Sequence, residues 1–175
     1  MQEQDIYGKY GVYLPKILDD LSQRIQEAND RVKQETGQKL FEHFNARVKQ
    51  AVSMEEKCQR KNLPRAPESA LKEIRDAIGI RIVCGFIEDI YQTIEVLRQL
   101  EGCEIVLEKD YIRAAKPNGY RSYHLILEVE TPYEDCHGQN PGRYFVEIQL
   151  RTIAMDSWAS LEHQMKYKHE IKDSK

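Results

Sequence analysis

Two carboxylates stand where a sheet protein could hold a metal ion. Asp76 lies just before the short apolar run GIRIVCGF (79–86), and Glu147 alternates with apolar residues in RYFVEIQLR (143–151). Carboxylates at the ends or on the polar face of central strands can hold Mg²⁺, which prefers a few hard oxygens together with substrate phosphates. The alternative interpretation of each residue alone is a surface aspartate at a strand start and a solvent-facing glutamate.

Cations gather in short segments around these carboxylates, although the chain carries a net charge of −3. One segment covers 47–61, Arg81 follows Asp76, and a second segment covers 109–121. Phosphoryl transfer needs chiefly positioning and neutralisation of phosphate charge, so this pattern suggests two phosphorylated ligands and a metal. Neither a P-loop nor a GxGxxG motif is present. For 53–61, a solvated charged helix remains the alternative interpretation.

The stretch KDYIRAAKPNGYRSYHL (109–125) combines cations and three tyrosines with an Asn-Gly pair. Asn-Gly predicts a turn. A turn alone does not need the surrounding cations and His124, so the stretch could also hold a flat, anionic ligand.

The elements that must position these residues follow from hydrophobic periodicity. Helical spacing predicts an amphipathic helix over 14–33 that ends near Gly37, and a second short helix over 38–45. Arg47 and Lys49 then share one face of an extended stretch. Ser53 is predicted to cap the next helix, with Glu56 completing a capping box.

The second half of the chain is predicted to be rich in strands. We expect strands over 79–86, 103–109, 122–130 and 143–151, with a helix over 88–100. Thr152 is predicted to cap a final helix whose apolar stripe consists of Ala154, Trp158, Leu161 and Met165. This order predicts a single α/β (α+β) domain, in which a mixed sheet of about five strands is flanked by helices.

Composition excludes several classes of protein. A chain of 175 residues can bury one hydrophobic core. Its net negative charge does not give the overall basic surface typical of proteins that bind duplex nucleic acid. No apolar run is long enough to span a membrane, and the N-terminus lacks the order of a secretory signal. The four cysteines stand too far apart for a metal knuckle, so we expect reduced thiols in a cytoplasmic protein.

Four segments carry a resemblance to a known family: ARVKQAVSMEEKCQRK, RDAIGIRIVC, KDYIRAAKPNGYRSYHL and VEIQLRTIAMDSWASLEHQ. Over about residues 42–168 the sequence resembles the synthetase domain of RelA/SpoT-type guanosine tetra- and pentaphosphate synthetases, in the short form called small alarmone synthetases. The resemblance implies a nucleotidyltransferase-like fold, with an N-terminal helical segment over 1–37 and a catalytic domain over 38–175 in one compact unit.

The resemblance implies a bacterial, Mg²⁺-dependent enzyme that transfers the β,γ-pyrophosphate of ATP to the 3′-hydroxyl of GDP or GTP. Asp76 and Glu147 would be the catalytic and metal-binding residues. The implied ATP-binding residues are Arg47, Lys49, Ser53, Lys57, Arg60 and Arg81. The implied guanine-nucleotide residues are Lys109, Lys116, Asn118, Tyr120, His124, Gln149 and Ala154. A homo-oligomer (dimer or tetramer) and regulatory RNA binding are further implications.

The sequence departs from the family pattern in several places. Ala114-Ala115 replaces a frequent Asn-Pro, Asn45-Ala46 replaces a frequent Thr-Gly, and no His-Asp hydrolase motif is present. Relatives often continue with further helices after the Trp158 helix, and the sequence does not decide whether the C-terminus is truncated. Two alternative functions stay open: a toxin-type relative that modifies adenosine nucleotides or the tRNA 3′ end, and an inactive nucleotide- or RNA-binding regulator. The sequence does not choose between GDP, GTP and GMP.

Overall fold

A computed structural model describes residues 3–173, so the outermost residues of the predicted segments 1–37 and 38–175 lie outside it. Five strands form one mixed sheet in the order β1-β2-β5-β4-β3. Their bounds are β1 His43–Val48, β2 Ile78–Cys84, β3 Cys103–Asp110, β4 Tyr123–Thr131 and β5 Gly142–Thr152. Only the β2–β5 pairing is parallel in this sheet. The predicted mixed sheet of about five strands in a single domain is confirmed.

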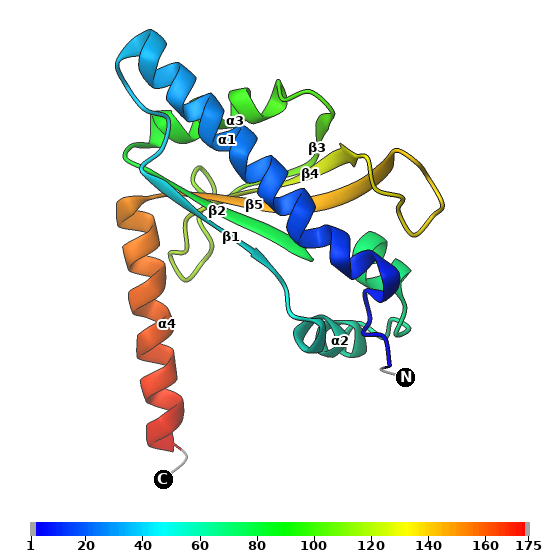
Figure 1. Ribbon diagram of the computed structural model, residues 1–175. Helices are drawn as coiled ribbons and strands as arrows, with labels where there is room; N and C mark the ends of the chain where they lie inside the picture. The colour runs from blue at the N-terminus through cyan, green and yellow to red at the C-terminus, as the bar shows by residue number, and fades with distance from the viewer. Residues whose placement is uncertain (1–2, 174–175) are drawn as a thin grey trace.

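Helices α1 (Leu14–Thr36) and α3 (Ile87–Arg98) cover one face of the sheet (Figure 1). The apolar stripe of α1, from Leu14 to Ala28, is buried, as are Ile90, Ile94 and Leu97 of α3. They pack with β2, β4 and β5 in one core. Helix α1 ends at Gly37, as predicted, and Gly37 adopts the left-handed conformation (φ 76°).

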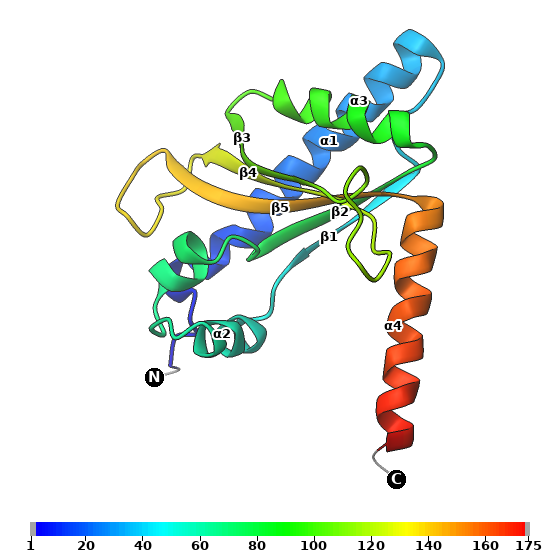
Figure 2. The same ribbon diagram turned by 180° about the vertical axis from the view of Figure 1, so that it is seen from behind.

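The opposite face of the sheet is flanked by α2 (Ala51–Arg60), the 111–122 loop and α4 (Ile153–Asp173) (Figures 1 and 2). Helix α4 projects away from the body of the molecule. The predicted apolar stripe of α4 is therefore largely exposed: Trp158 is 39% exposed, Leu161 60% and Met165 68%. Within residues 3–173, no helix combines the length and hydrophobicity needed to cross a membrane.

The predicted helix over 38–45 is wrong, because this region leads into strand β1. Buried Asn29 of α1 explains why: its Oδ1 accepts the main-chain N–H of Leu40 at 2.7 Å, and its Nδ2 donates to the carbonyl of Phe41. These bonds satisfy the main chain without helical pairing, and β1 then pairs antiparallel with β2. Tertiary partners therefore override local propensity.

The predicted cap at Ser53 is also wrong. Helix α2 begins at Ala51 with Gln50 as its N-cap residue, so Ser53 lies inside the first turn. The main chain is fixed just before the helix, where the N–H of Lys49 donates to the Ala77 carbonyl at 2.8 Å.

All four cysteines are free thiols, as expected, and Cys58 and Cys84 are buried.

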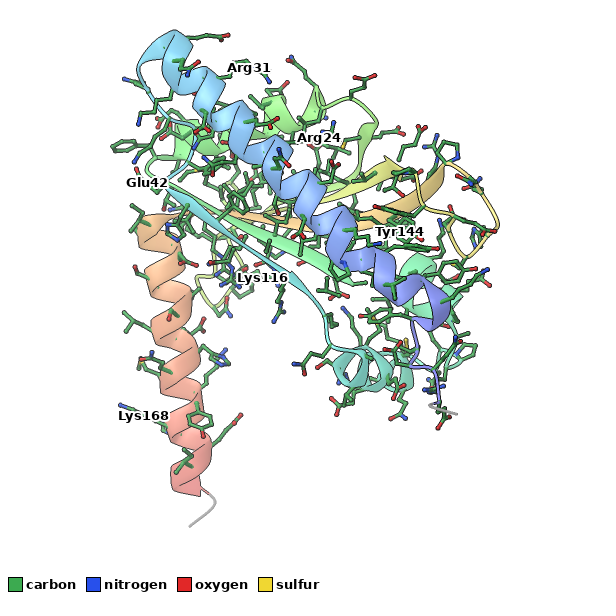
Figure 3. The ribbon with its side chains drawn as sticks, in the orientation of Figure 1. Arg24, Arg31, Glu42, Lys116, Tyr144 and Lys168 are labelled. Carbon is green, nitrogen blue, oxygen red and sulfur yellow. The ribbon has the colours of Figure 1, made fainter. Side chains whose placement is uncertain are left out.

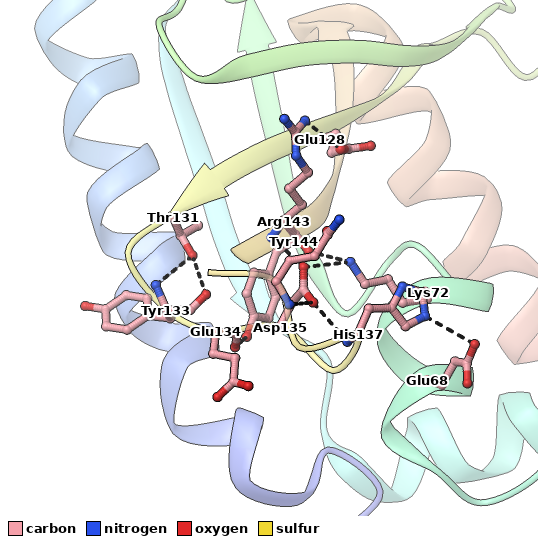
Figure 4. Close-up of polar contacts among 11 residues, drawn as sticks. Glu68, Lys72, Glu128, Thr131, Tyr133, Glu134, Asp135, His137, Arg143 and Tyr144 are labelled. Carbon is pink, nitrogen blue, oxygen red and sulfur yellow. Dashed lines mark hydrogen bonds and ion pairs between the residues drawn. The ribbon is translucent and has the colours of Figure 1, made fainter. Parts of the chain in front are cut away.

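The connection between β4 and β5 is organised by Asp135, which is 1% exposed (Figure 4). Its carboxylate accepts main-chain N–H groups of His137, Gln139 and Arg143, and pairs with the Lys72 ammonium at 3.2 Å. Burial alone raises the pKa of Asp135, but these hydrogen bonds outweigh it and lower the pKa below its usual value. Lys72 belongs to the π-helical turn Ser69–Glu73, so the connection is fastened to the segment that precedes Asp76.

Gly142 has no room for a side chain in this connection, because a Cβ there would lie 1.9 Å from the Tyr133 carbonyl oxygen. Gly142→Ala should therefore lower the free energy of unfolding by about 1–3 kcal/mol, the usual cost of overpacking. Urea denaturation measures this. Gly85→Ala is the matched control, since its Cβ would meet only ordinary contacts beginning at 3.5 Å. Equal stability of the two variants would contradict the packing at Gly142.

Candidate active site

Two rows of paired residues cross the face of the sheet opposite α1. In the first row, Arg81 of β2 pairs with Asn45 on one side and Gln149 on the other, and His124 and Lys109 continue it. In the second row, Gly79 lies between Arg47 and Glu147. Paired residues of neighbouring strands point to the same face. Residues predicted separately for ATP and for the guanine nucleotide are thereby brought onto one surface.

A cavity of about 220 Å³ opens over both rows. Both predicted carboxylates, Asp76 and Glu147, line it together with Arg47, Arg81 and Gln149. Gly79 also lines it, and a Cβ at Gly79 would meet no atom within 4 Å. The missing side chain therefore leaves open volume beside Glu147, where a ligand could approach the sheet backbone closely.

Asp76 is held by two lysines through only one of its oxygens. The ammonium groups of Lys49 and Lys57 lie 2.6 and 2.7 Å from its Oδ2. Burial alone raises the pKa of the Asp76 carboxyl, but these hydrogen bonds lower it below its usual value. Asp76 is therefore an anion at neutral pH, and its buried Oδ1 has no hydrogen-bond partner within residues 3–173.

Unpaired buried polar atoms concentrate around this site. Across the described residues there are four such side-chain atoms, and three belong to Asp76, Gln149 and Arg151. A buried group without a partner costs free energy, so such a concentration indicates a place where a ligand supplies the partners. Glu147 accepts a hydrogen bond from the Gln149 amide at 2.8 Å, which fixes the direction of both side chains.

These residues fit a magnesium ion. Asp76, which has one oxygen without a partner, and Glu147 line one cavity, and hard oxygen ligands are what Mg²⁺ prefers. In the part of the chain that the structure describes, no group of three or more His, Cys, Asp or Glu could hold a metal alone. Two carboxylates completed by substrate phosphates are the arrangement typical of Mg²⁺ in phosphoryl-transfer sites.

A second cavity of about 560 Å³ adjoins the first and shares Arg47 and Arg81 with it. Tyr120, Arg151 and the inner side of α4, including His163 and Lys166, form its other walls. The two shared arginines place the two cavities side by side. Four cationic side chains, Arg47, Arg81, Arg151 and Lys166, therefore lie along the two cavities, interspersed with carboxylates.

Tyr120 lies in a fixed orientation at the second cavity. Its hydroxyl accepts a hydrogen bond from the Arg151 guanidinium at 2.6 Å and lies 3.0 Å from His124 Nε2. The Lys116 ammonium lies over the rings of both Tyr111 and Tyr120, and Figure 3 shows Lys116 on the face opposite α1. The Asn118-Gly119 turn is confirmed: Asn118 Oδ1 accepts the N–H of Tyr120, and Gly119 (φ 86°) packs against Trp158.

Other predicted residues lie nearer the edge of the site. Ser53 and Arg60 are exposed on α2 and share a helix face with Lys57, because their spacings are four and three residues. Lys109 is exposed on the edge strand β3, and Ala154 is exposed in the first turn of α4. None of these four residues belongs to the described lining of either cavity.

Arg151 is a site residue that the sequence interpretation left without a role. It is 6% exposed, and its guanidinium lies over the Tyr120 ring, with Nη1 3.2 Å from Asp156. The alternation of residues along this strand could have identified it, because Arg151 follows Glu147 and Gln149 at the two-residue spacing of one strand face. The second cavity also includes His163 and Lys166, whose contribution depends on where α4 projects.

The comparisons with known proteins agree with this geometry. A family model described as "Region found in RelA / SpoT proteins" matches residues 46–172. The chain belongs to the RelA/SpoT family. It is 46% identical over 133 residues to the GTP pyrophosphokinase YwaC of Bacillus subtilis, a match that covers 75% of this chain and 61% of YwaC. The GTP pyrophosphokinase YjbM of the same organism is 34% identical over 154 residues, covering 88% of this chain and 70% of YjbM.

Solved structures of this RelA/SpoT family share the fold. Small alarmone synthetase 1 from Bacillus subtilis bound to its product pppGpp superposes with a TM-score of 0.77 at 31% identity, covering 93% of this chain and 80% of that chain. Small alarmone synthetase 2 from the same organism gives a TM-score of 0.74 at 40% identity, covering 91% and 79%. The resemblance to small alarmone synthetases is confirmed by these matches.

The environment of His124 makes folding stability depend on pH. Burial, and then the charges of Arg151, Lys116, Lys109 and Arg81, lower its pKa from 6.5 to about 4. Between these two pH values His124 binds a proton in the unfolded chain but not in the folded protein. Folding stability therefore falls as the pH drops through this window.

We therefore expect His124→Gln to lose less melting temperature than the parent protein between pH 6.5 and pH 4. Thermal denaturation at a series of pH values measures this. His137→Gln serves as the control, because His137 is exposed and pairs with Glu68 instead. If the stability of His124→Gln depended on pH as that of the parent protein does, the folded protein would bind a proton at His124 as readily as the unfolded chain, which would contradict this explanation.

Proposed function

We propose that this protein is a GTP/GDP 3′-pyrophosphokinase that uses Mg²⁺ and makes guanosine tetra- or pentaphosphate. The pair of adjoining cavities is the main observation that supports this proposal. They share two arginines, and one contains both carboxylates while the other contains Tyr120. Two polyphosphates must meet beside an acidic centre in such a reaction, and the adjoining cavities provide this arrangement.

The donor side of the site consists of the cations around Asp76. Lys49 and Lys57 already lie at that carboxylate, and Ser53 and Arg60 extend the same face of α2. We assign the phosphates of ATP to these residues. Arg47 and Arg81 lie where the two cavities meet, and their flat guanidinium groups suit either the adenine ring or the phosphates.

The acceptor side consists of the loop that contains Tyr120. A guanine ring stacked on tyrosine gains contact area at low entropic cost, and Asn118 can contact its edge. Lys109 and Lys116 would neutralise the acceptor's phosphates, while neutral His124 can hydrogen-bond its ribose. Gln149 and Ala154 complete the assignment, with the unpaired Gln149 Oε1 offering an acceptor.

The reaction forms a bond between the 3′-oxygen of the guanine nucleotide and the β-phosphorus of ATP. The bond from that phosphorus to the α,β-bridging oxygen breaks, and AMP leaves with the electron pair. The proton of the 3′-hydroxyl passes to the Glu147 carboxylate and then to solvent. When bound, Mg²⁺ would neutralise phosphate charge and lower the pKa of the attacking hydroxyl. Asp76 and Glu147 would hold it.

The names of the relatives support the same assignment. Solved structures of small alarmone synthetase 1 from Bacillus subtilis contain pppGpp in one case and AMPCPP in another. This chain spans about three fifths of the length of YwaC, with 61% covered, so the transfer of activity to it is a proposal. Assembly into a dimer or tetramer, regulatory RNA binding and a cytoplasmic location belong to this proposal as further predictions.

An acceptor assay tests the proposed activity. With ATP labelled at the γ-phosphate and Mg²⁺ present, we expect label to appear on GDP or GTP and to disappear when the Mg²⁺ is chelated. Parallel reactions contain GMP, ADP or tRNA. Label chiefly on ADP or tRNA would support a toxin-type relative, and absence of label on every acceptor would support an inactive regulator. Either result would contradict the proposal.

Replacing Glu147 tests its assigned role. Glu147→Gln keeps the size of the side chain and one acceptor oxygen for the Gln149 amide but cannot accept the proton, so product formation should fall by about 10²-fold or more. The initial rate and the melting temperature are measured together. Glu130→Gln, an exposed glutamate on β4, is the control and should retain full activity. Undiminished synthesis by Glu147→Gln would refute the role assigned to Glu147.

A further inference from the structure

The N-terminal segment reaches the site from outside the region that the family model matches. That match begins at residue 46, whereas Tyr7 precedes α1 in the chain. Tyr7 is 4% exposed, and its hydroxyl donates a hydrogen bond to the main-chain carbonyl of Lys49 at 2.7 Å. A buried tyrosine hydroxyl needs such a partner, so this contact is specific rather than incidental.

The peptide groups at Lys49 are therefore fixed from two directions. Its N–H donates to the carbonyl of Ala77 at 2.8 Å, and its carbonyl accepts from Tyr7. The Lys49 side chain then reaches Asp76 Oδ2 at 2.6 Å, with only 17% of that side chain exposed. A shift of the main chain at Lys49 would move the ammonium that determines which oxygen of Asp76 is free.

The segment that carries Tyr7 is itself anchored on both sides. The Arg65 guanidinium donates to the Gln4 carbonyl and to Glu55 of α2, each at 2.9 Å. The N–H of Tyr7 donates to Asp5, and Ile6 is 1% exposed in the core. Burial, followed by the charges of Asp76, Asp5 and Cys58, raises the pKa of Tyr7 above its ordinary value. The hydroxyl thus keeps its proton and remains a donor.

We propose that Tyr7 is a positioning residue for the ATP side of the site, acting through the main chain of Lys49 on the Lys49–Asp76 pair. The N-terminal segment is then a functional part of the synthetase and not only a cover for its core. This role rests on the proposed function, because it assigns ATP to the residues around Asp76.

The test is the substitution Tyr7→Phe in the full chain. It removes one hydroxyl, keeps the ring in the core and leaves the Lys49 carbonyl without its donor. We expect kcat/KM for ATP to fall roughly fivefold to tenfold, the usual effect of one lost hydrogen bond. KM for GDP should stay unchanged, because Tyr7 contacts the donor side only. Calorimetric titration with ATP and Mg²⁺ should show a matching loss of affinity without turnover.

Two variants separate positioning from stability. Ile6→Val removes one buried methyl group from the neighbouring residue and should lower the melting temperature without an effect specific to ATP. Tyr13→Phe removes a hydroxyl from a tyrosine whose ring stacks on Tyr133, and should behave as the parent protein. Equal losses for ATP in Tyr7→Phe and Ile6→Val, or parallel losses for ATP and GDP, would overturn the role of Tyr7.

The two proposals fail in different ways. If the parent protein transfers no pyrophosphate to any acceptor, the proposed function is wrong, while the calorimetric comparison of ATP binding still tests Tyr7. If the parent protein is active and Tyr7→Phe binds and uses ATP normally, only the role of Tyr7 is wrong.

Discussion

The contact between Asp76 and its two lysines is the constraint on which the site depends. An aspartate buried to this extent would ordinarily raise its pKa, but Lys49 and Lys57 keep it charged and bind only Oδ2. Oδ1 is left buried and without a hydrogen-bond partner in the described part of the chain, in a residue that lines the first cavity. Asp76, kept ionised in this way, can bind a cation through its second oxygen. The surrounding arginines can bind the phosphates that accompany that cation.

The pairing of the strands places the residues for two ligands on one face of the sheet. Because β2 and β5 are parallel neighbours, Gly79 pairs with Glu147, and Arg81 pairs with Gln149. β1 adds Arg47 on one side, and β4 adds His124 on the other. Helices α1 and α3 bury the opposite face, so the polar face is left for ligands between α2, the 111–122 loop and α4.

Much of this architecture could be predicted from the sequence, because strand alternation places Glu147 and Gln149 on one face and helical spacing defines α1. Sequence reasoning failed where long-range contacts decide the local structure. The main chain at 40–41 is bound by Asn29, and α2 begins early because Lys49 is already fixed by distant partners. Tyr7, separated from Lys49 by 42 residues, left no local signal.

The most direct measurement is a crystal structure of the protein with a non-hydrolysable ATP analogue, Mg²⁺ and GDP. We expect Mg²⁺ on Asp76 Oδ1 and Glu147, with guanine stacked on Tyr120. The 3′-oxygen of GDP should face the β-phosphorus, at the roughly 3–3.5 Å separation of a near-attack arrangement. A metal bound away from Asp76, or both nucleotides bound outside the two adjoining cavities, would contradict this expectation.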